Sequence, residues 1–296
     1  MKPALLFIIN PISGSRRGSE AESAIKQSSL HETFDIEIVK TQYRMHAAEL
    51  AKQAAGKKIY GVIAAGGDGT VNEVASSLVH SDTALGIVPV GSGNGLARHL
   101  KISRDIRKAI DQIQSANVER VDTLKINNRF ALNVSGLGYD GYVAWLFDKE
   151  GKRGLSSYTR IGLREYFFYP SAEFELDIDN KKINATAHMV VIANASQFGN
   201  AAIISPKSDV KDGLMDVIIV KRPSVIKLPF TFFRLFNGTL KEDENIRMYQ
   251  CKKLLVNCSR PLHLHIDGEP NEPVGNLSVE LIPASLRIFS SAKQNN

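Results

Sequence analysis

The chain has 296 residues, of which 43% are hydrophobic and 23% charged, a composition typical of globular proteins. These fractions exclude a disordered, collagen-like or coiled-coil chain. The 37 Lys and Arg residues exceed the 31 Asp and Glu residues by 6, and the excess is split evenly between residues 1–125 and the remainder. Such a mild positive charge favours anionic partners, whether nucleotide, nucleic acid or an anionic membrane surface, without choosing among them.

The length predicts one large or two medium domains, at about 150 residues per domain. Two cysteines, Cys251 and Cys258, are too few for a disulfide scaffold and lack CxxC spacing, so we expect reduced thiols in a cytoplasmic protein. The longest apolar stretch, residues 130–147, is interrupted by glycines and by Asp140. It fails the test of about 18 nearly charge-free residues, so we expect no transmembrane segment and only peripheral membrane contact.

Short runs rich in β-branched residues alternate with helical patterns over the first part of the chain. The alternation predicts a mostly parallel sheet with helices on both faces. The expected strands are residues 4–9, 35–40, 59–64, 85–90 and 119–126, and the expected helices lie around residues 18–30, 46–56, 70–80 and 94–115.

From about residue 126 the pattern changes to strand-like segments separated by Gly, Asn, Asp and Pro turns. This change predicts a second, mainly β domain. We therefore expect a nucleotide-binding α/β domain over residues 1–125 and a mainly β domain over residues 126–296, with the option that the last strand returns to the first domain.

Three of the expected strands run directly into glycine-rich loops. The loops are residues 10–18 (NPISGSRRG), 66–70 (GGDGT) and 91–95 (GSGNG). Ligands of open α/β sheets bind at the carboxyl ends of parallel strands. Glycines let the backbone approach a phosphate closely, and the N-terminus of a following helix offers free N–H groups. The three loops together therefore predict a phosphate-binding site.

Asp68 lies inside the second loop, where a phosphate would repel its carboxylate unless Mg²⁺ or a transferable proton lay between them. We therefore expect phosphoryl chemistry rather than simple binding. A single glycine-rich turn is most often only a turn, but three at strand ends favour a function. The GxxxxGK[ST] motif is absent and GSGNG lacks GxGxxG spacing, which disfavours a P-loop NTPase and a Rossmann dehydrogenase.

The motifs NPISG, GGDGTVNEV and VPVGSGNGLARHL, in this order, resemble the diacylglycerol kinase catalytic-domain superfamily, which includes bacterial soluble lipid kinases and sphingosine kinases. Residues 205–217 and the segment Asp267-Gly268-Glu269-Pro270 resemble motifs of its second domain, so the resemblance spans nearly the whole chain. It implies a parallel-sheet α/β nucleotide domain, like that of NAD kinases and phosphofructokinases, followed by a C-terminal β-sandwich domain, with the site in the cleft between them.

The same resemblance implies that ATP binds to the first domain. The residues expected to bind it are Asn10, Thr41, Gly66, Gly67, Asp68, Gly69, Thr70, Val71, Asn72 and Ser92. Bacterial diacylglycerol kinases usually carry NDFAR after the third loop, whereas this chain has NGLAR at residues 94–98, closer to the sphingosine-kinase pattern. This departure leaves open whether the acceptor lipid is diacylglycerol-like or sphingoid-like.

Two acids are the catalytic candidates. By resemblance to the bacterial lipid kinases, Glu269 takes the proton from the acceptor hydroxyl, while Asp68 holds the catalytic metal or orients the acceptor. The sphingosine-kinase pattern instead makes Asp68 the base. From the residues alone, Asp-Gly followed by Pro270 is a hairpin turn. Both interpretations of this segment can hold, because a turn that faces the site presents its acid well.

Asp209, Asp212 and Leu214 match the family's structural magnesium position, with a carboxylate from Asp212 and backbone carbonyls from the other two. Oxygen ligands suit Mg²⁺. The spacing alone indicates only a turn at Lys211-Asp212-Gly213. Asp122 occupies a family position that could link this ion to the active site, and its alternative interpretation is an ordinary acid at a strand end.

His263, His265 and Asp267 alternate along one strand and could share a face, as zinc ligands do. We expect instead plain alternation on a solvent-exposed strand. Residues 152–170 and 227–240 interleave Arg and Lys with aromatic residues, which suits a membrane interface or a helix packed on the β domain. We expect core packing for most of these side chains.

The leading hypothesis is a lipid kinase that uses ATP and Mg²⁺ to phosphorylate a hydroxyl of a membrane lipid at the inner membrane surface. One alternative is an NAD kinase, which shares GGDGT and the two-domain plan, and another is a non-catalytic protein that senses nucleotide or lipid. We expect no nucleic-acid partner, because the sequence has no groove-reading motif. The oligomeric state is open, with a homodimer among the options.

Overall fold

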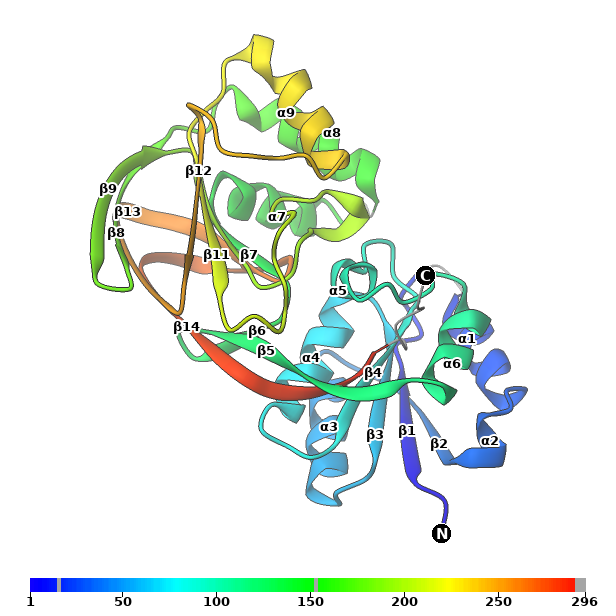
Figure 1. Cartoon of the computed structure of the whole chain (residues 1–296). Helices are drawn as coiled ribbons and strands as arrows, with labels where there is room; N and C mark the ends of the chain where they lie inside the picture. Colours follow the sequence, from blue (N-terminus) through cyan, green and yellow to red (C-terminus); the bar gives the residue numbers. More distant parts are fainter. Residues whose placement is uncertain (15–16, 152–153, 291–296) are drawn as a thin grey trace. The chain divides into compact units, whose positions relative to one another are not determined.

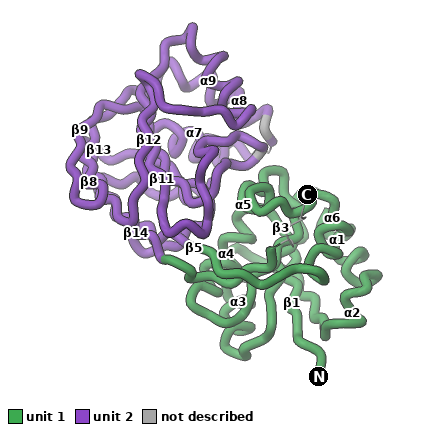
Figure 2. Tube along the Cα trace, in the orientation of Figure 1, with its two compact units in different colours: residues 1–122, 283–296 green, residues 123–282 purple. Residues whose placement is uncertain are grey.

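The computed structural model describes residues 1–14, 17–151 and 154–290 (Figure 1). Contacts within the chain divide it into two compact units (Figure 2). Unit 1 comprises Met1–Asp122 together with the segment from Pro283 onward, and unit 2 comprises Thr123–Ile282. Among the described residues, no helix is both long and apolar enough to cross a membrane.

Unit 1 is built on a parallel sheet in the order β4-β3-β1-β2. The first strand, β1, lies between β2 and β3, so the chain leaves β1 toward one side and later continues on its other side. This reversal of strand order creates a topological switch point, where open α/β sheets bind ligands. The strands are β1 (Ala4–Ile9), β2 (Asp35–Lys40), β3 (Gly61–Gly66) and β4 (Ala84–Pro89).

Helices cover both faces of this sheet, as Figure 1 shows, with α3 packed against α4 and α1 against α6. Each residue of β3 and β4 is buried, as expected for parallel strands covered on both sides. The helices are α1 (Arg17–Lys26), α2 (Leu30–Thr33), α3 (His46–Gly56), α4 (Asp68–Leu78), α5 (Gly95–His99) and α6 (Ile106–Gln114).

The single helix expected over residues 94–115 is wrong, because α5 and α6 are separate helices. Lys101 adopts the left-handed conformation, with φ of 56°, which an α-helix does not continue through. Asp105 then caps α6, since its carboxylate accepts a hydrogen bond of 3.0 Å from the N–H of Lys108. The apolar pattern continues across this break, so periodicity alone did not reveal it.

Unit 2 is an antiparallel β-sandwich. Its strands follow the order β12-β11-β10-β7-β13-β14, and β8 pairs with both β13 and β9. The long strand β13 pairs with β8 near its start and with β7 near its end, and its register with β14 shifts between Asn257 and Leu262. This irregularity lets one strand serve both layers of the sandwich. The remaining strands are β5 (Asn117–Ile126), β6 (Arg129–Ala131), β7 (Val134–Gly138), β8 (Ala172–Ile178), β9 (Lys181–Ala187), β10 (Met189–Ala193), β11 (Met215–Val220), β12 (Ile246–Cys251), β13 (Lys253–Ile266) and β14 (Glu269–Ser290). Of these, β5 up to Asp122 and β14 from Pro283 belong to unit 1.

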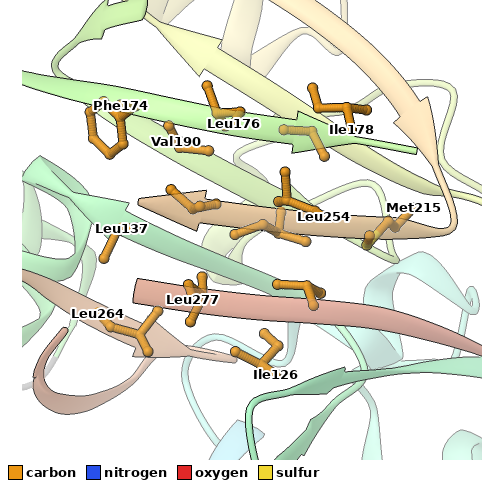
Figure 3. Close-up of a cluster of buried hydrophobic side chains, with 14 of the residues drawn as sticks. Ile126, Leu137, Phe174, Leu176, Ile178, Val190, Met215, Leu254, Leu264 and Leu277 are labelled. Carbon is orange, nitrogen blue, oxygen red and sulfur yellow. The ribbon is translucent and has the colours of Figure 1, made fainter. Parts of the chain in front are cut away.

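The core of unit 2 lies between the layers and consists mainly of aliphatic side chains, together with Phe174, Met215 and Cys251 (Figure 3). On β8, Phe174, Leu176 and Ile178 are buried, while the intervening residues are more exposed. This alternation is the period-2 pattern of a strand with one face toward the core. The expected fold class, a parallel-sheet α/β domain followed by a β-sandwich domain, is confirmed.

In the described part of unit 2, three α-helices accompany the sandwich, and α7 was not expected from the strand-rich pattern. Gly141 explains how α7 can pack directly on β13, because a Cβ at this position would collide with the carbonyl oxygen of His263. The helices are α7 (Tyr139–Glu150), α8 (Leu155–Tyr166) and α9 (Leu228–Phe236), with single 3₁₀ turns η1 (Gly199–Ala201) and η2 (Val225–Lys227).

Candidate functional site

The glycine-rich loops that follow β1, β3 and β4 meet in unit 1. A Cβ on Gly91 of the third loop would lie 2.5 Å from the Cα of Gly67 in the second. Gly14 of the first loop has φ of +64°, and a Cβ there would collide with the carbonyl oxygen of Val90. Only glycine permits these approaches. The three loops thus form one backbone-lined surface at the switch point, while Ser15 and Arg16 lie outside the described residues.

Asn10 joins the first loop to the second. Its Nδ2 donates a 3.0 Å hydrogen bond to Oγ1 of the buried Thr70, and its Oδ1 accepts a 3.1 Å bond from the N–H of Ile12. The second bond is an Asx turn that fixes the start of the loop. Two of the residues expected to bind nucleotide are therefore direct neighbours.

Asp68 joins the second loop to the third. Its Oδ2 accepts a 2.8 Å hydrogen bond from the N–H of Asn94, and its Oδ1 accepts a 2.7 Å bond from the N–H of Gly95. Arg98 closes the third loop further, because its Nε donates a 3.0 Å bond to the carbonyl oxygen of Gly93. Sequence reasoning missed this positioning role of Asp68, which only the approach of two loops 26 residues apart reveals.

The charge state of Asp68 reflects two opposed effects. Burial raises the pKa of its carboxyl group, while the N–H groups of Gly95 and Asn94 and the charge of Arg98 act to lower it. The raised pKa indicates that burial is the stronger effect. A carboxylate oxygen that accepts one hydrogen bond keeps another lone pair, so Asp68 can still contact a ligand or metal.

The first turn of α4 begins at Asp68, and within the described chain no side chain caps it. The start of this helix, at the positive end of its dipole, therefore suits an anion. Within this turn the side chain of Val71 is buried, and its N–H bonds to the carbonyl of Gly67 at 3.0 Å. Asn72 is half-buried, and its Oδ1 accepts a 3.4 Å bond from Ser76.

Thr41 and Ser92 lie at the ends of their strands as expected. Thr41 follows β2, is half-buried, and its N–H donates a 2.9 Å bond to the carbonyl of Ile9. Ser92 is exposed in the third loop. Their hydroxyl groups are of the kind that binds phosphate or ribose oxygens.

Glu269 belongs to unit 2 and is half-buried at the first position of β14. The preceding Asp267 and Gly268 have φ of 51° and 86° and connect Ile266 to Glu269 as a two-residue hairpin turn. Positive φ at both central positions is the type I′ pattern that Asp-Gly favours. The hairpin expected for this segment is confirmed, and it places Glu269 immediately after the turn.

The hydrogen bonds of Asp267 connect the hairpin turn to a neighbouring segment of unit 2. Its buried carboxylate accepts bonds of 2.8 Å and 2.9 Å from the N–H groups of Leu132 and Asn133. Its own N–H donates to the hydroxyl oxygen of Ser135 at 3.3 Å. Asp267 thus ties the turn to the segment between β6 and β7.

The expectation that His263, His265 and Asp267 alternate on an exposed strand is wrong, because His265 and Asp267 are buried. The Nδ1 atom of His265 accepts a 3.1 Å bond from the N–H of Gly268, so its Nε2 carries the proton and donates to Asp140 at 3.2 Å. The His263 ring instead packs against aromatic side chains of α7. Sequence reasoning missed Asp140, which marks the start of α7.

The expected magnesium ligands lie in a turn of unit 2. Asp212 donates its N–H to the carbonyl of Asp209 at 3.3 Å, and its Oδ1 accepts a 2.9 Å bond from the N–H of Leu214. One carboxylate and two carbonyl oxygens are donors of the hard type that Mg²⁺ prefers, so these residues fit the ion in kind. Within the described ranges, no three His, Cys, Asp or Glu side chains converge as a metal cluster.

Asp122 is buried at the end of the first segment of unit 1. Its Oδ1 accepts a 2.7 Å hydrogen bond from the N–H of Ala284, on the part of β14 that belongs to the same unit. This contact supports the interpretation of Asp122 as a structural acid that fixes the returning strand.

Two family models match consecutive parts of the chain. Residues 4–126 match the diacylglycerol kinase catalytic domain, and residues 133–290 match the YegS C-terminal NAD kinase beta sandwich-like domain. Each match covers one of the two kinds of domain seen in the structure.

Named relatives cover nearly the same span. A diacylglycerol kinase of Bacillus subtilis is 27% identical over 89% of this chain and 88% of its own length. Another from Staphylococcus saprophyticus is 23% identical over 91% and 90%. A crystal structure of a diacylglycerol kinase from Bacillus anthracis has a TM-score of 0.76 at 21% identity, over 98% of this chain and 97% of that one. The last comparison bears on the fold alone.

Proposed function

The chain belongs to the diacylglycerol kinase catalytic-domain family, and from this we propose that it is an ATP-dependent lipid kinase. The observation that carries the proposal is the junction of the three glycine loops at the switch point of unit 1. Bare backbone, an uncapped helix start and hydroxyl side chains suit the phosphates of a nucleotide. The proposal includes a cytoplasmic protein that acts peripherally at the inner membrane surface.

In the proposed reaction, the hydroxyl oxygen of the acceptor lipid forms a bond to the γ-phosphorus of ATP. The bond from that phosphorus to the bridging oxygen of the β-phosphate breaks, and ADP leaves with its electron pair. The hydroxyl proton passes to the carboxylate of Glu269, with Asp68 as the alternative base. Positioning of the reactants and stabilisation of the charge on the transferred phosphoryl group lower much of the barrier. The hydrogen bonds between the three loops support both effects, because they hold the candidate nucleotide-binding groups in place.

Mg²⁺ would neutralise charge on the phosphates when bound. Asp68 is our candidate ligand near the nucleotide, and Asp209, Asp212 and Leu214 are the candidates for a structural ion in unit 2. Hydrogen bonds from the N–H groups of Asn94 and Gly95 already hold the Asp68 carboxylate, so this candidate ligand is fixed before the ion binds.

The test is transfer of radiolabelled γ-phosphate from ATP to diacylglycerol, phosphatidylglycerol, sphingosine, ceramide and NAD. We expect label on one of the lipids, and a loss of at least about 100-fold in rate for Asp68→Ala and Glu269→Ala. Asp111→Ala and Glu272→Ala are matched controls. Asp111 is an exposed acid in the same unit as Asp68, and Glu272 is an exposed acid three residues after Glu269. They should retain the rate of the unaltered protein.

Several outcomes would overturn parts of the proposal. ATP binding without any labelled lipid would reject the kinase, and label on NAD alone would identify an NAD kinase. A full rate in Asp68→Ala would move the site away from the three loops. An active Glu269→Ala alone would transfer the role of the base to Asp68, or leave positioning as the main catalytic effect.

A further inference from the structure

The outward side of α9 is entirely apolar. At about 100° per residue, one arc of this helix carries a proline and four phenylalanines. Phe230 is 70% exposed and Phe233 is 66% exposed. Leu235 lies on the opposite side and packs against a buried cluster of unit 2. The residues of the outward arc are Pro229, Phe230, Phe232, Phe233 and Phe236.

Further exposed apolar side chains lie on η2 and on the residues just after α8. Phe168 is 78% exposed and Ile226 is 83% exposed. The two segments are joined, because the Arg222 guanidinium donates to the carbonyl oxygens of Tyr166 and Phe167 at 2.8 Å and 2.9 Å. Figure 1 shows α8 and α9 together on unit 2. We define the phenylalanine face as Phe167, Phe168, Val225, Ile226, Pro229, Phe230, Phe232, Phe233 and Phe236.

The size of the phenylalanine face marks it as an interaction surface. The four phenylalanines of α9 leave roughly 430 Å² of apolar surface in water, at about 200 Å² for a whole side chain, and Phe167 and Phe168 bring the sum to roughly 700 Å². The largest apolar patch on a typical monomer is about 300–600 Å². Our expectation that most of these aromatic side chains pack in the core is therefore wrong for α9, in which no residue is buried.

The charges around the phenylalanine face indicate which kind of partner it fits. Residues 221–236 contain four basic residues and no acid. Lys227 and Arg234 pair with Glu244 and Asp243 at the flank, whereas Arg222 is held by carbonyl oxygens that do not neutralise its charge. Phenylalanines bordered by Lys and Arg are the composition of helices that lie in the interface of an anionic bilayer.

We propose that the phenylalanine face is the surface by which unit 2 docks on an anionic lipid bilayer. The inference rests on the proposed function, since a kinase of membrane lipids must reach an acceptor that stays in the bilayer. Docking would bury the phenylalanines at the boundary of headgroups and acyl chains, with Lys221 and Arg222 among anionic headgroups. A second copy of the chain fits less well, because a symmetric contact would bring residues 221–236 of both copies together with like charge.

The experiment is co-sedimentation of the full chain, without ATP, with vesicles of phosphatidylcholine alone or mixed equally with phosphatidylglycerol. We expect binding to the mixed vesicles that weakens with added salt. Phe230→Ser/Phe233→Ser should lower the partition coefficient at least about tenfold, because two large apolar side chains leave the contact. Leu255→Ser is the matched control, since Leu255 is an exposed apolar residue on β13 of the same unit and should leave binding unchanged.

Kinase activity on a short-chain, water-soluble diacylglycerol separates this inference from the proposed function. The double variant should keep that activity and lose activity only on vesicle-embedded lipid. Binding of the double variant equal to that of the unaltered chain, or no binding of the unaltered chain at low salt, would overturn the docking surface. Concentration-dependent dimerisation that the double variant abolishes, without vesicle binding, would assign the face to a second copy instead.

Discussion

At the scale of single residues, burial decides the role of several polar side chains. Asp267, His265 and Asp122 carry groups that chemistry could use, yet each is buried and hydrogen-bonded within its own unit. A buried polar group without a partner costs free energy, so these contacts are needed for folding. Asp68 differs from the other three, because it holds a loop beside the expected phosphate site.

His188 departs from this pattern, and the stability of the protein should depend on pH as a result. Its ring is buried, stacks on Tyr139 at 4.5 Å, and in the described structure neither ring nitrogen has a hydrogen-bond partner. Burial, followed by the charge of Arg222, lowers the pKa of His188 from 6.5 to about 4. The unfolded chain therefore binds a proton at this site between these two values, when the folded chain does not.

We expect the free energy of unfolding to fall as the pH drops from about 6.5 to about 4, with a contribution of up to about 1.4 kcal/mol per pH unit from this one site. His188→Phe should remove that contribution while keeping a stacked ring. Urea unfolding across this pH range, compared between the variant and the unaltered chain, measures the difference. Identical pH slopes in both proteins would show that His188 does not titrate as described.

At the scale of elements, the three loops work as one unit because glycine removes the side chains between them. Gly67 and Gly91 face each other, and Asp68 bonds the N–H groups at the start of α5. Glycine spacing in the sequence indicated three loops, but not which loops touch. Helix α9 shows the opposite case. Its apolar pattern predicted packing against the domain, yet its outward arc is exposed.

Gly91→Ala tests the contact between the loops. The new Cβ would lie 2.5 Å from the Cα of Gly67, a backbone atom that cannot rotate away, so the second and third loops must separate. We expect ATP affinity to fall at least about tenfold, because the N–H groups lose their common orientation. Isothermal titration with ATP measures the change.

The matched control is Gly56→Ala in α3 of the same unit, where a Cβ meets nothing within 4 Å. This substitution should leave ATP affinity unchanged and keep or slightly raise stability. Equal ATP affinity in Gly91→Ala and Gly56→Ala would contradict the tight contact between the loops.

At the scale of the whole molecule, the chain returns to unit 1 at its end. The segment of β14 beyond Pro283 belongs to unit 1, where Ile288 pairs with Leu85 of β4 in parallel. Phe289 is buried in the core of that unit, against the space left by Gly61. Unit 1 is therefore completed by residues from the far end of the sequence.

Phe289→Ala should lower the free energy of unfolding by about 3–5 kcal/mol, because it removes a large buried side chain and leaves a cavity. Leu255→Ala, at an exposed position, should change it by less than about 0.5 kcal/mol. Thermal and urea unfolding of the two variants provide the comparison. A small loss for Phe289→Ala would mean that unit 1 does not depend on the returning strand.

The sequence by itself determined the features that local patterns encode. Alternating strand and helix periods indicated the parallel sheet, glycine spacing indicated the loops, and Asp-Gly indicated the hairpin before Glu269. Tertiary structure alone decided the bonds from Asp68 to the third loop, the burial of His265 and the outward arc of α9. These features depend on contacts between residues far apart in the chain, and such contacts leave no periodic signal in a single sequence.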